Sequence, residues 1–355
     1  MALQSVLRRL GRNLDHYIHN RPAIFFTNIL LTYKCTQRCL QCTIPSLAHE
    51  HPRISFDNFK LIIDKLDRYG TQGLTISGGE PMAHPDLPEI LAYAAGKSFT
   101  NIHLLTTLYA SERVVERTLD AVFANDISLS CSFDGFGEVA DTLRGGHDVA
   151  RRVRSGIDKF NRRNEKRQKQ LGAFLNIVIS QYNLYQIPEL LQMAESVGWK
   201  VNLDLYRWQS GNHRENNEMK ITDFVQLGKV IDAARKSPSV LTPDWLLNGY
   251  PGYLKDDFPK RCPYLDNTTL GSKFFIHPNG DVAVCIGDHI GNLLSEDPEE
   301  IFASSKWQKR QVEFRACRGC WNTCYTPSAK LSSYMNVKDL RQAGDLFRKI
   351  FDKQK

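Results

Sequence analysis

Three cysteines within eight residues constrain this chain more than any other feature. Cys35, Cys39 and Cys42 are spaced C-x3-C-x2-C in the run ILLTYKCTQRCLQCTIP. One short loop with this spacing can direct three thiolates onto one metal centre. A single tetrahedral zinc or iron needs a fourth protein ligand, and no His or Cys follows within the next few residues. Three thiolates with an open position instead indicate a [4Fe-4S] cluster whose free iron binds a small chelating molecule.

The alternative for this loop is a zinc knuckle or a chance cluster, so the remaining cysteines matter. The chain has nine cysteines, and all except Cys131 fall into two groups. No apolar run reaches the roughly 18 residues that span a bilayer, and the N-terminus lacks a signal-peptide pattern. These observations predict a cytoplasmic protein whose grouped cysteines bind metal instead of forming disulfides.

Strand and helix patterns alternate about six times before residue 210. The predicted strands cover residues 23–31, 73–77, 101–107, 126–133, 173–180 and 201–207. Amphipathic segments lie between them, and the first begins at the capping residue Ser55 and ends at Gly70. This alternation is typical of a parallel sheet whose reactive face lies at the carboxyl ends of the strands. We therefore predict an α/β fold, a partial (βα)6 TIM-like barrel, followed by a small C-terminal α+β cluster-binding extension.

The turn Gly78-Gly79-Glu80-Pro81 follows the second predicted strand. Two glycines let the backbone approach a ligand closely, because they carry no side chain. On this interpretation, a side chain at Gly79 collides with the ligand and leaves the cysteine thiolates untouched. The alternative is a purely structural connection between strand and helix.

The cysteine triplet and this turn together resemble the motifs of the radical S-adenosylmethionine (radical SAM) superfamily. The residue before the third cysteine, commonly aromatic in that family, is Gln41 here. The resemblance implies a [4Fe-4S] cluster on Cys35, Cys39 and Cys42, with S-adenosylmethionine bound to its free iron. It also implies that residues 78–81, namely Gly78, Gly79, Glu80 and Pro81, contact the methionine amino group. Reductive cleavage of the cofactor would then give a 5'-deoxyadenosyl radical that removes a hydrogen atom from a substrate.

Further positions follow from the same resemblance. The segment from Ser130 to Gly135 resembles the family's SxDG strand end, which makes Ser132 the candidate for binding the ribose hydroxyls. Arg144 is a candidate for pairing with the cofactor carboxylate, because a guanidinium matches a carboxylate; the alternative is a surface salt bridge. Cys131 is interpreted either as a small buried side chain or as a catalytic thiol that returns a hydrogen atom to a substrate radical.

The C-terminal cysteines resemble the auxiliary-cluster domain called SPASM, or its shorter relative called twitch. The predicted auxiliary ligands are Cys262, Cys285, Cys317, Cys320 and Cys324. Five cysteines favour one auxiliary [4Fe-4S] cluster over two, and the shorter pattern leaves Cys324 as a spare or alternate ligand. The alternative is a zinc ribbon, which four cysteines on turn-bearing hairpins would also make.

The predicted organisation has five parts. They are an N-terminal amphipathic helix (1–22), the partial barrel (23–210), a helical bridge (211–257), the auxiliary cluster domain (258–336) and a C-terminal helix (337–355). The net charge of +7 is concentrated in residues 151–170. This basic helix lacks interleaved aromatics, so we interpret it as a solvated face and predict no nucleic-acid binding. The N-terminal helix either covers the barrel or contacts a membrane surface.

The resemblance implies a one-electron reductant such as flavodoxin or ferredoxin, and a net oxidation or rearrangement of the substrate. Peptide-modifying relatives often carry a leader-binding domain of about 80 residues, and only 34 residues precede Cys35. We therefore expected a small-molecule or lipid-linked substrate. The alternatives are radical modification of a ribosomal peptide and, from another class, a non-catalytic iron–sulfur or zinc protein.

Overall fold

The computed structural model describes residues 22–44, 53–208, 213–256, 272–284 and 289–316, with Trp321 and Thr323. Its described strands form a single sheet in the order β6-β5-β4-β3-β2-β1-β7-β8-β9. The first six strands are parallel to one another. They are β1 (Ile24–Leu30), β2 (Gly73–Ser77), β3 (Asn101–Thr106), β4 (Ser128–Ser132), β5 (Ala173–Ile179) and β6 (Lys200–Leu205).

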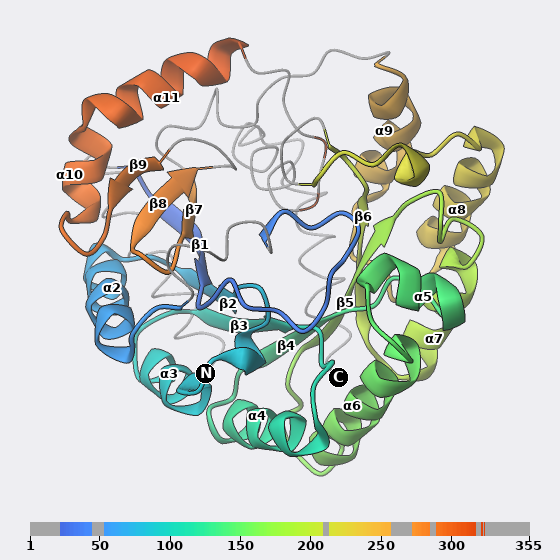
Figure 1. Cartoon of the computed structure of the whole chain (residues 1–355), viewed down its shortest axis with the longest axis horizontal. Coiled ribbons are helices and arrows are strands. Elements are labelled where there is room, and N and C mark those ends of the chain that lie inside the picture. The colour runs from blue at the N-terminus through green and yellow to red at the C-terminus, as the bar shows by residue number, and fades with distance from the viewer. Residues whose placement is uncertain are drawn as a thin grey trace.

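Helices cover the outer face of this curved sheet (Figure 1). In the barrel they are α2 (Phe56–Tyr69), α3 (Leu87–Ala95), α4 (Glu112–Ala124), α5 (Gly137–Arg144), α6 (Val149–Asn164) and α7 (Ile187–Ser196). Beyond the barrel follow α8 (Phe224–Lys236), α9 (Asp244–Lys255), α10 (Pro298–Ala303) and α11 (Ser305–Ala316). The sheet does not close on itself, so the predicted partial barrel is confirmed.

Local sequence signals set the first crossover helix. The Ser55 side chain accepts a hydrogen bond from the Asn58 amide and caps α2, and Gly70 ends the helix with a φ of 93°. The apolar stripe that includes Phe59 and Leu66 is fully buried against the sheet. Each crossover helix buries one apolar face in this way, so the chain packs back onto the sheet and enters the next parallel strand.

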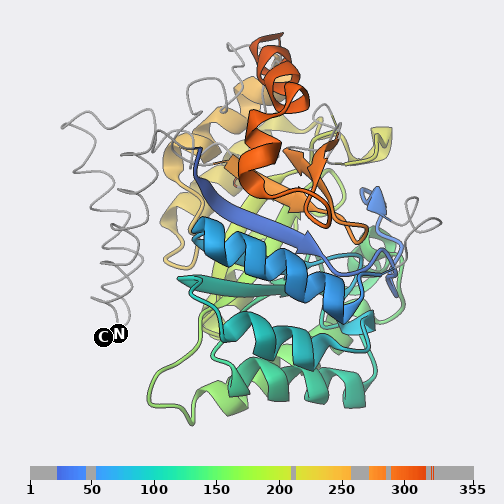
Figure 2. The same cartoon turned by 90° about the vertical axis from the view of Figure 1, so that its left-hand side faces the viewer.

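The C-terminal extension continues the barrel sheet. Strand β7 (Ser272–Ile276) pairs in parallel with β1, and β8 (Asp281–Val284) and β9 (His289–Asn292) follow as antiparallel strands. In Figure 2 this part lies directly against β1 and α2. Lys65 of α2 donates to the Glu296 carbonyl at 2.9 Å, and the Tyr69 and Phe302 rings stack. Because β7 is parallel to β1, both strands end at the same edge of the sheet.

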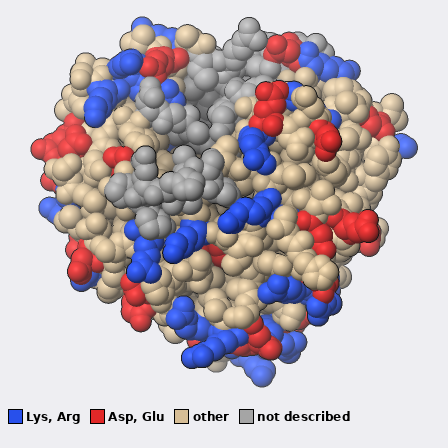
Figure 3. Space-filling view, in the orientation of Figure 1, with Lys and Arg blue, Asp and Glu red and all other residues tan. Residues whose placement is uncertain are grey.

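The basic helix is paired within the chain. Lys159 of α6 lies 2.9 Å from Glu116 of α4, and Arg163 lies 2.8 Å from Asp120. Positive and negative side chains accordingly lie next to each other along the lower margin in Figure 3, where Figure 1 places α4 and α6. Partly exposed pairs of this kind add little stability, but they offset the positive charge of the face. The structure thus agrees with a solvated helix face.

The sequence pattern did not indicate helix α5, and it covered α9 only within the helical bridge 211–257. Helix α5 is short, and α9 contains Gly249 and Pro251, which disguise its apolar periodicity. The predicted terminal helices lie outside the described residues. No helix within the described ranges is both long and apolar enough to cross a membrane.

Candidate active site

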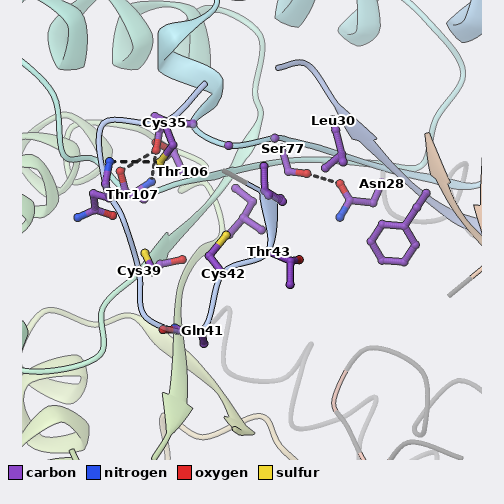
Figure 4. A pocket seen from close by; sticks show the side chains of 18 of the residues that line it. Asn28, Leu30, Cys35, Cys39, Gln41, Cys42, Thr43, Ser77, Thr106 and Thr107 are labelled. Carbon is purple, nitrogen blue, oxygen red and sulfur yellow. Dashed lines mark hydrogen bonds between the residues drawn. The ribbon is translucent and has the colours of Figure 1, made fainter. Parts of the chain in front are cut away.

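A cavity of about 570 Å³ opens at the carboxyl ends of the first strands. It collects side chains from the loops after β1 to β4 and from the C-terminal extension (Figure 4). The predicted site residues that line it are Cys35, Cys39, Cys42, Gly78, Gly79, Glu80, Ser132 and Arg144. The fold therefore brings the cysteine triplet, the glycine turn and the end of β4 into one site, where parallel strands place ligands in general.

The cysteine loop is fixed by backbone hydrogen bonds to the end of α5. The amides of Arg38 and Leu40 donate to the carbonyls of Arg144 and Leu143, each at 3.0 Å. Burial raises the pKa of the Cys35 thiol to about 11 and also raises the pKa of Cys42. Thiols in such surroundings ionise only beside a cation, which bound iron provides.

The three thiols have the chemistry that an iron–sulfur cluster requires. In a [4Fe-4S] cluster each thiolate binds a different iron. Cys35, Cys39 and Cys42 all line the cavity, so one loop offers three thiolates to one site. The donor set therefore suits the cluster that the sequence predicts.

The glycine turn packs against the backbone of the cysteine loop. The Gly79 amide donates to the Thr32 carbonyl at 2.6 Å, and the Glu80 amide donates to the Lys34 carbonyl at 2.8 Å. A Cβ atom on Gly79 would lie 2.4 Å from the Lys34 oxygen and 2.6 Å from the Tyr33 oxygen. The structure therefore argues against our expectation that a side chain at Gly79 leaves the thiolates untouched, because a Cβ there would meet the chain that leads into Cys35.

Glu80 joins this turn to the end of β3. Its buried carboxylate accepts hydrogen bonds from the Thr106 hydroxyl at 2.5 Å, from the Thr107 amide and hydroxyl at 2.8 and 2.6 Å, and from the Met82 amide at 3.0 Å. Burial raises the pKa of Glu80, and the same hydrogen bonds oppose that rise. Thr106 and Thr107 thus have a structural role that the sequence did not reveal.

Replacing Glu80 by glutamine should lower the free energy of unfolding by about 1–3 kcal/mol. The new amide group would face donors at Thr107 or Met82, and one buried N–H would lose its acceptor. Anaerobic urea unfolding measures this loss. The matched control is Glu138→Gln, at an exposed position of α5. Equal stability of the two variants would contradict the assigned role of Glu80.

Arg144 already has a carboxylate partner within the chain. Its Nη2 lies 2.6 Å from Asp134, and its Nη1 lies 3.9 Å from the Cys39 sulfur. Although burial disfavours its charge, the Asp134 carboxylate raises the pKa of Arg144 above its ordinary value. Arg144 thus forms a salt bridge within the chain, but the pair is buried and does not lie on the surface as the alternative interpretation expected. The backbone of Arg144 supports the cysteine loop at the same time. Ser132 lies at the carboxyl end of β4 and lines the cavity, as the predicted ribose contact requires.

Cys131 lies away from the cavity. Its side chain is 0% exposed, belongs to the main hydrophobic core, and donates to the Thr107 carbonyl at 3.5 Å. Burial raises its pKa well above the ordinary range of a thiol. The catalytic interpretation of Cys131 is therefore corrected, since a hydrogen donor has to reach the substrate, and the small buried side chain is the interpretation that fits.

Several polar groups at the cavity are placed for a polar ligand. Gln37 is 1% exposed, and neither atom of its side-chain amide has a hydrogen-bond partner within the described residues. The same is true of the Gln41 Oε1 and the Arg144 Nε. Buried groups of this kind are costly unless a ligand or water satisfies them. They suit a cofactor such as S-adenosylmethionine, which carries amino, carboxylate and hydroxyl groups.

Sequence reasoning missed three histidines at the cavity. His213 follows the barrel, whereas His277 and His289 belong to the C-terminal extension. Lone histidines carry no motif, and the parallel pairing of β7 with β1 could have indicated only those of the extension, His277 and His289.

Two family models match the chain. The model described as the radical SAM superfamily matches residues 29–170, which include the cysteine loop, the glycine turn and Ser132. Residues 29–170 therefore form a radical SAM domain. A second model, described as the iron–sulfur cluster-binding SPASM domain, matches residues 268–322. The first domain implies a [4Fe-4S] cluster and S-adenosylmethionine, and the second implies auxiliary iron–sulfur binding.

The predicted auxiliary ligands Cys262, Cys285, Cys317, Cys320 and Cys324 lie outside the described residues. Their assignment therefore remains a prediction from the sequence and from the match to the SPASM domain. The number of auxiliary clusters remains a prediction in the same way.

Curated relatives and a solved structure resemble this chain over most of its length. The PqqA peptide cyclase of Bradyrhizobium diazoefficiens is 26% identical, over 72% of this chain and 64% of that protein. The antilisterial bacteriocin subtilosin biosynthesis protein AlbA of Bacillus subtilis is 26% identical, over 80% and 61%. Streptococcus suis SuiB, solved with its precursor peptide SuiA, matches with a TM-score of 0.62 and 16% identity over 84% and 69%. The chain spans less than two thirds of the length of these two curated relatives.

Proposed function

We propose that this chain is a radical SAM enzyme that modifies a peptide substrate. The observation that carries the proposal is the shared cavity, which joins the three cysteines, the glycine turn and the end of β4. When bound, the cluster and S-adenosylmethionine supply a 5'-deoxyadenosyl radical that takes a hydrogen atom from the substrate. The protein supplies binding, orientation and exclusion of water.

The site residues have the following roles in this proposal. Cys35, Cys39 and Cys42 hold the cluster, and the backbone of residues 78–81 faces the amino group of the cofactor. Ser132 offers a hydroxyl to the ribose. Apolar side chains of Leu30, Leu105 and Phe275 complete the wall and limit access of water.

The comparisons support the peptide alternative more than the small-molecule or lipid-linked substrate that we expected. The two curated relatives are named for a peptide cyclase and for bacteriocin biosynthesis, and SuiB was solved with a precursor peptide. A separate protein can also deliver a peptide to such a site. Flavodoxin or ferredoxin remains our proposed reductant.

A two-stage anaerobic assay tests the proposal. Reconstituted protein with dithionite and S-adenosylmethionine should form 5'-deoxyadenosine, whereas a non-catalytic iron–sulfur or zinc protein would form none. Peptides encoded beside the gene should then accelerate this reaction and change mass. If no peptide accelerates cofactor cleavage and no peptide changes mass, the result would favour the small-molecule alternative.

A further inference from the structure

One side-chain hydrogen bond links the C-terminal extension to the cysteine loop. The hydroxyl of Tyr33, which follows β1, lies 2.6 Å from the Nδ1 of His277, which follows β7. These residues are 244 positions apart in the sequence. They meet because β7 pairs in parallel with β1, so the two strands end side by side.

The tyrosine end of this bond is tightly held. Tyr33 is 8% exposed, and its carbonyl lies against Gly79. The neighbouring Lys34 carbonyl accepts the Glu80 amide, and Cys35 is the next residue. A shift of the Tyr33 side chain would therefore move the chain that places the first thiolate.

The histidine end is fixed by a second set of contacts. The His277 ring lies 4.9 Å from the His289 ring, and His289 lies 2.9 Å from the Asp281 carboxylate. Asp281 in turn accepts hydrogen bonds from the side-chain amides of Asn279 at 2.6 Å and Asn292 at 2.9 Å. Burial, aided by the neighbouring His289, lowers the pKa of His277 to about 4. The ring is therefore neutral near pH 7. A neutral imidazole has one unprotonated nitrogen, which can accept a hydrogen bond from the Tyr33 hydroxyl.

We propose that His277, acting through Tyr33, is a positioning residue for the cysteine loop. The inference rests on the proposed function and extends it: the C-terminal extension forms part of the site that cleaves the cofactor, in addition to any role of its own cysteines. Cleavage depends on the exact placement of reacting groups, and a misplacement of about 1 Å can cost a hundredfold in rate. His277 and His289 line the same cavity as Cys35, so the extension is close enough to act in this way.

Substitutions at the two ends of the bond test the inference without any substrate. Tyr33→Phe and His277→Phe should each slow 5'-deoxyadenosine formation, in dithionite and S-adenosylmethionine alone, by about tenfold. The double variant should be no slower than either single variant, because all three lack the same bond. His277→Asn should keep most of the rate, since its amide oxygen can take the place of Nδ1. Tyr93→Phe is the control, because Tyr93 of α3 donates to Asp64 of α2 and neither residue lines the cavity.

Iron content and spectroscopy distinguish positioning from loss of structure. The variants should bind as much iron as the wild type, yet the electron paramagnetic resonance signal of the reduced cluster should change less on adding S-adenosylmethionine. Unchanged cleavage rates in both single variants, or losses that multiply in the double variant, would overturn the inference. A wild-type protein that binds the cluster but forms no 5'-deoxyadenosine would instead overturn the proposed function, and the cluster signal would then decide the inference alone.

Discussion

Replacing Cys35, Cys39 and Cys42 together by alanine should abolish 5'-deoxyadenosine formation completely. The three thiols line one cavity, and the described part of the chain offers that cavity no other cysteine. Without thiolates there is no ligand for the irons of the cubane, so the loss should be total instead of graded. Anaerobic reconstitution followed by chromatography of the products measures it.

Iron analysis adds a second result to the same experiment. With an auxiliary [4Fe-4S] cluster, the wild type should hold about eight irons and the triple variant about four. A C-terminal zinc ribbon predicts about four irons, one zinc, and no iron in the variant. The matched control is Cys131→Ala, which removes a thiol from the core and should keep the activity. Cofactor cleavage by the triple variant would disprove the assignment of the site.

The barrel could be predicted because its signals are local. Apolar runs such as residues 23–31 and capped amphipathic helices such as α2 can be recognised from a few neighbouring residues. The pairing of β7 with β1 has no such signal, because it joins segments far apart in the chain. The extension was therefore predicted as a separate unit, although its strands continue the barrel sheet.

Site residues that belong to a sequence motif could be predicted. Site residues that only the packing of distant segments brings together were missed. The spacing of the cysteines and the glycine turn marked the cavity in advance. The partners of Glu80 and the ion pair between Arg144 and Asp134 depend on which loops meet at the sheet edge. Cys131 shows the opposite error, since its place beside Ser132 in the sequence suggested chemistry that its direction into the core rules out.

Position 79 requires a glycine for a reason that its motif alone does not explain. The atoms nearest to an added Cβ are main-chain carbonyl oxygens of Lys34 and Tyr33, at 2.4 and 2.6 Å. Backbone atoms cannot rotate away as the end of a flexible side chain can. Even the smallest side chain therefore has to push the segment before Cys35 outward, or break the hydrogen bond from the Gly79 amide to Thr32.

Gly79→Ala should accordingly remove most of the iron of the first cluster together with S-adenosylmethionine binding, so that 5'-deoxyadenosine formation falls at least a hundredfold. Iron analysis and equilibrium binding of the cofactor measure the two losses separately. Gly228→Ala is the matched control, since nothing lies within 4 Å of a Cβ there and alanine favours a helix by about 1 kcal/mol over glycine. If Gly79→Ala kept its iron and lost only cofactor affinity, the glycine would serve the ligand as the sequence first suggested, and the close contact with the cysteine loop would have no functional weight.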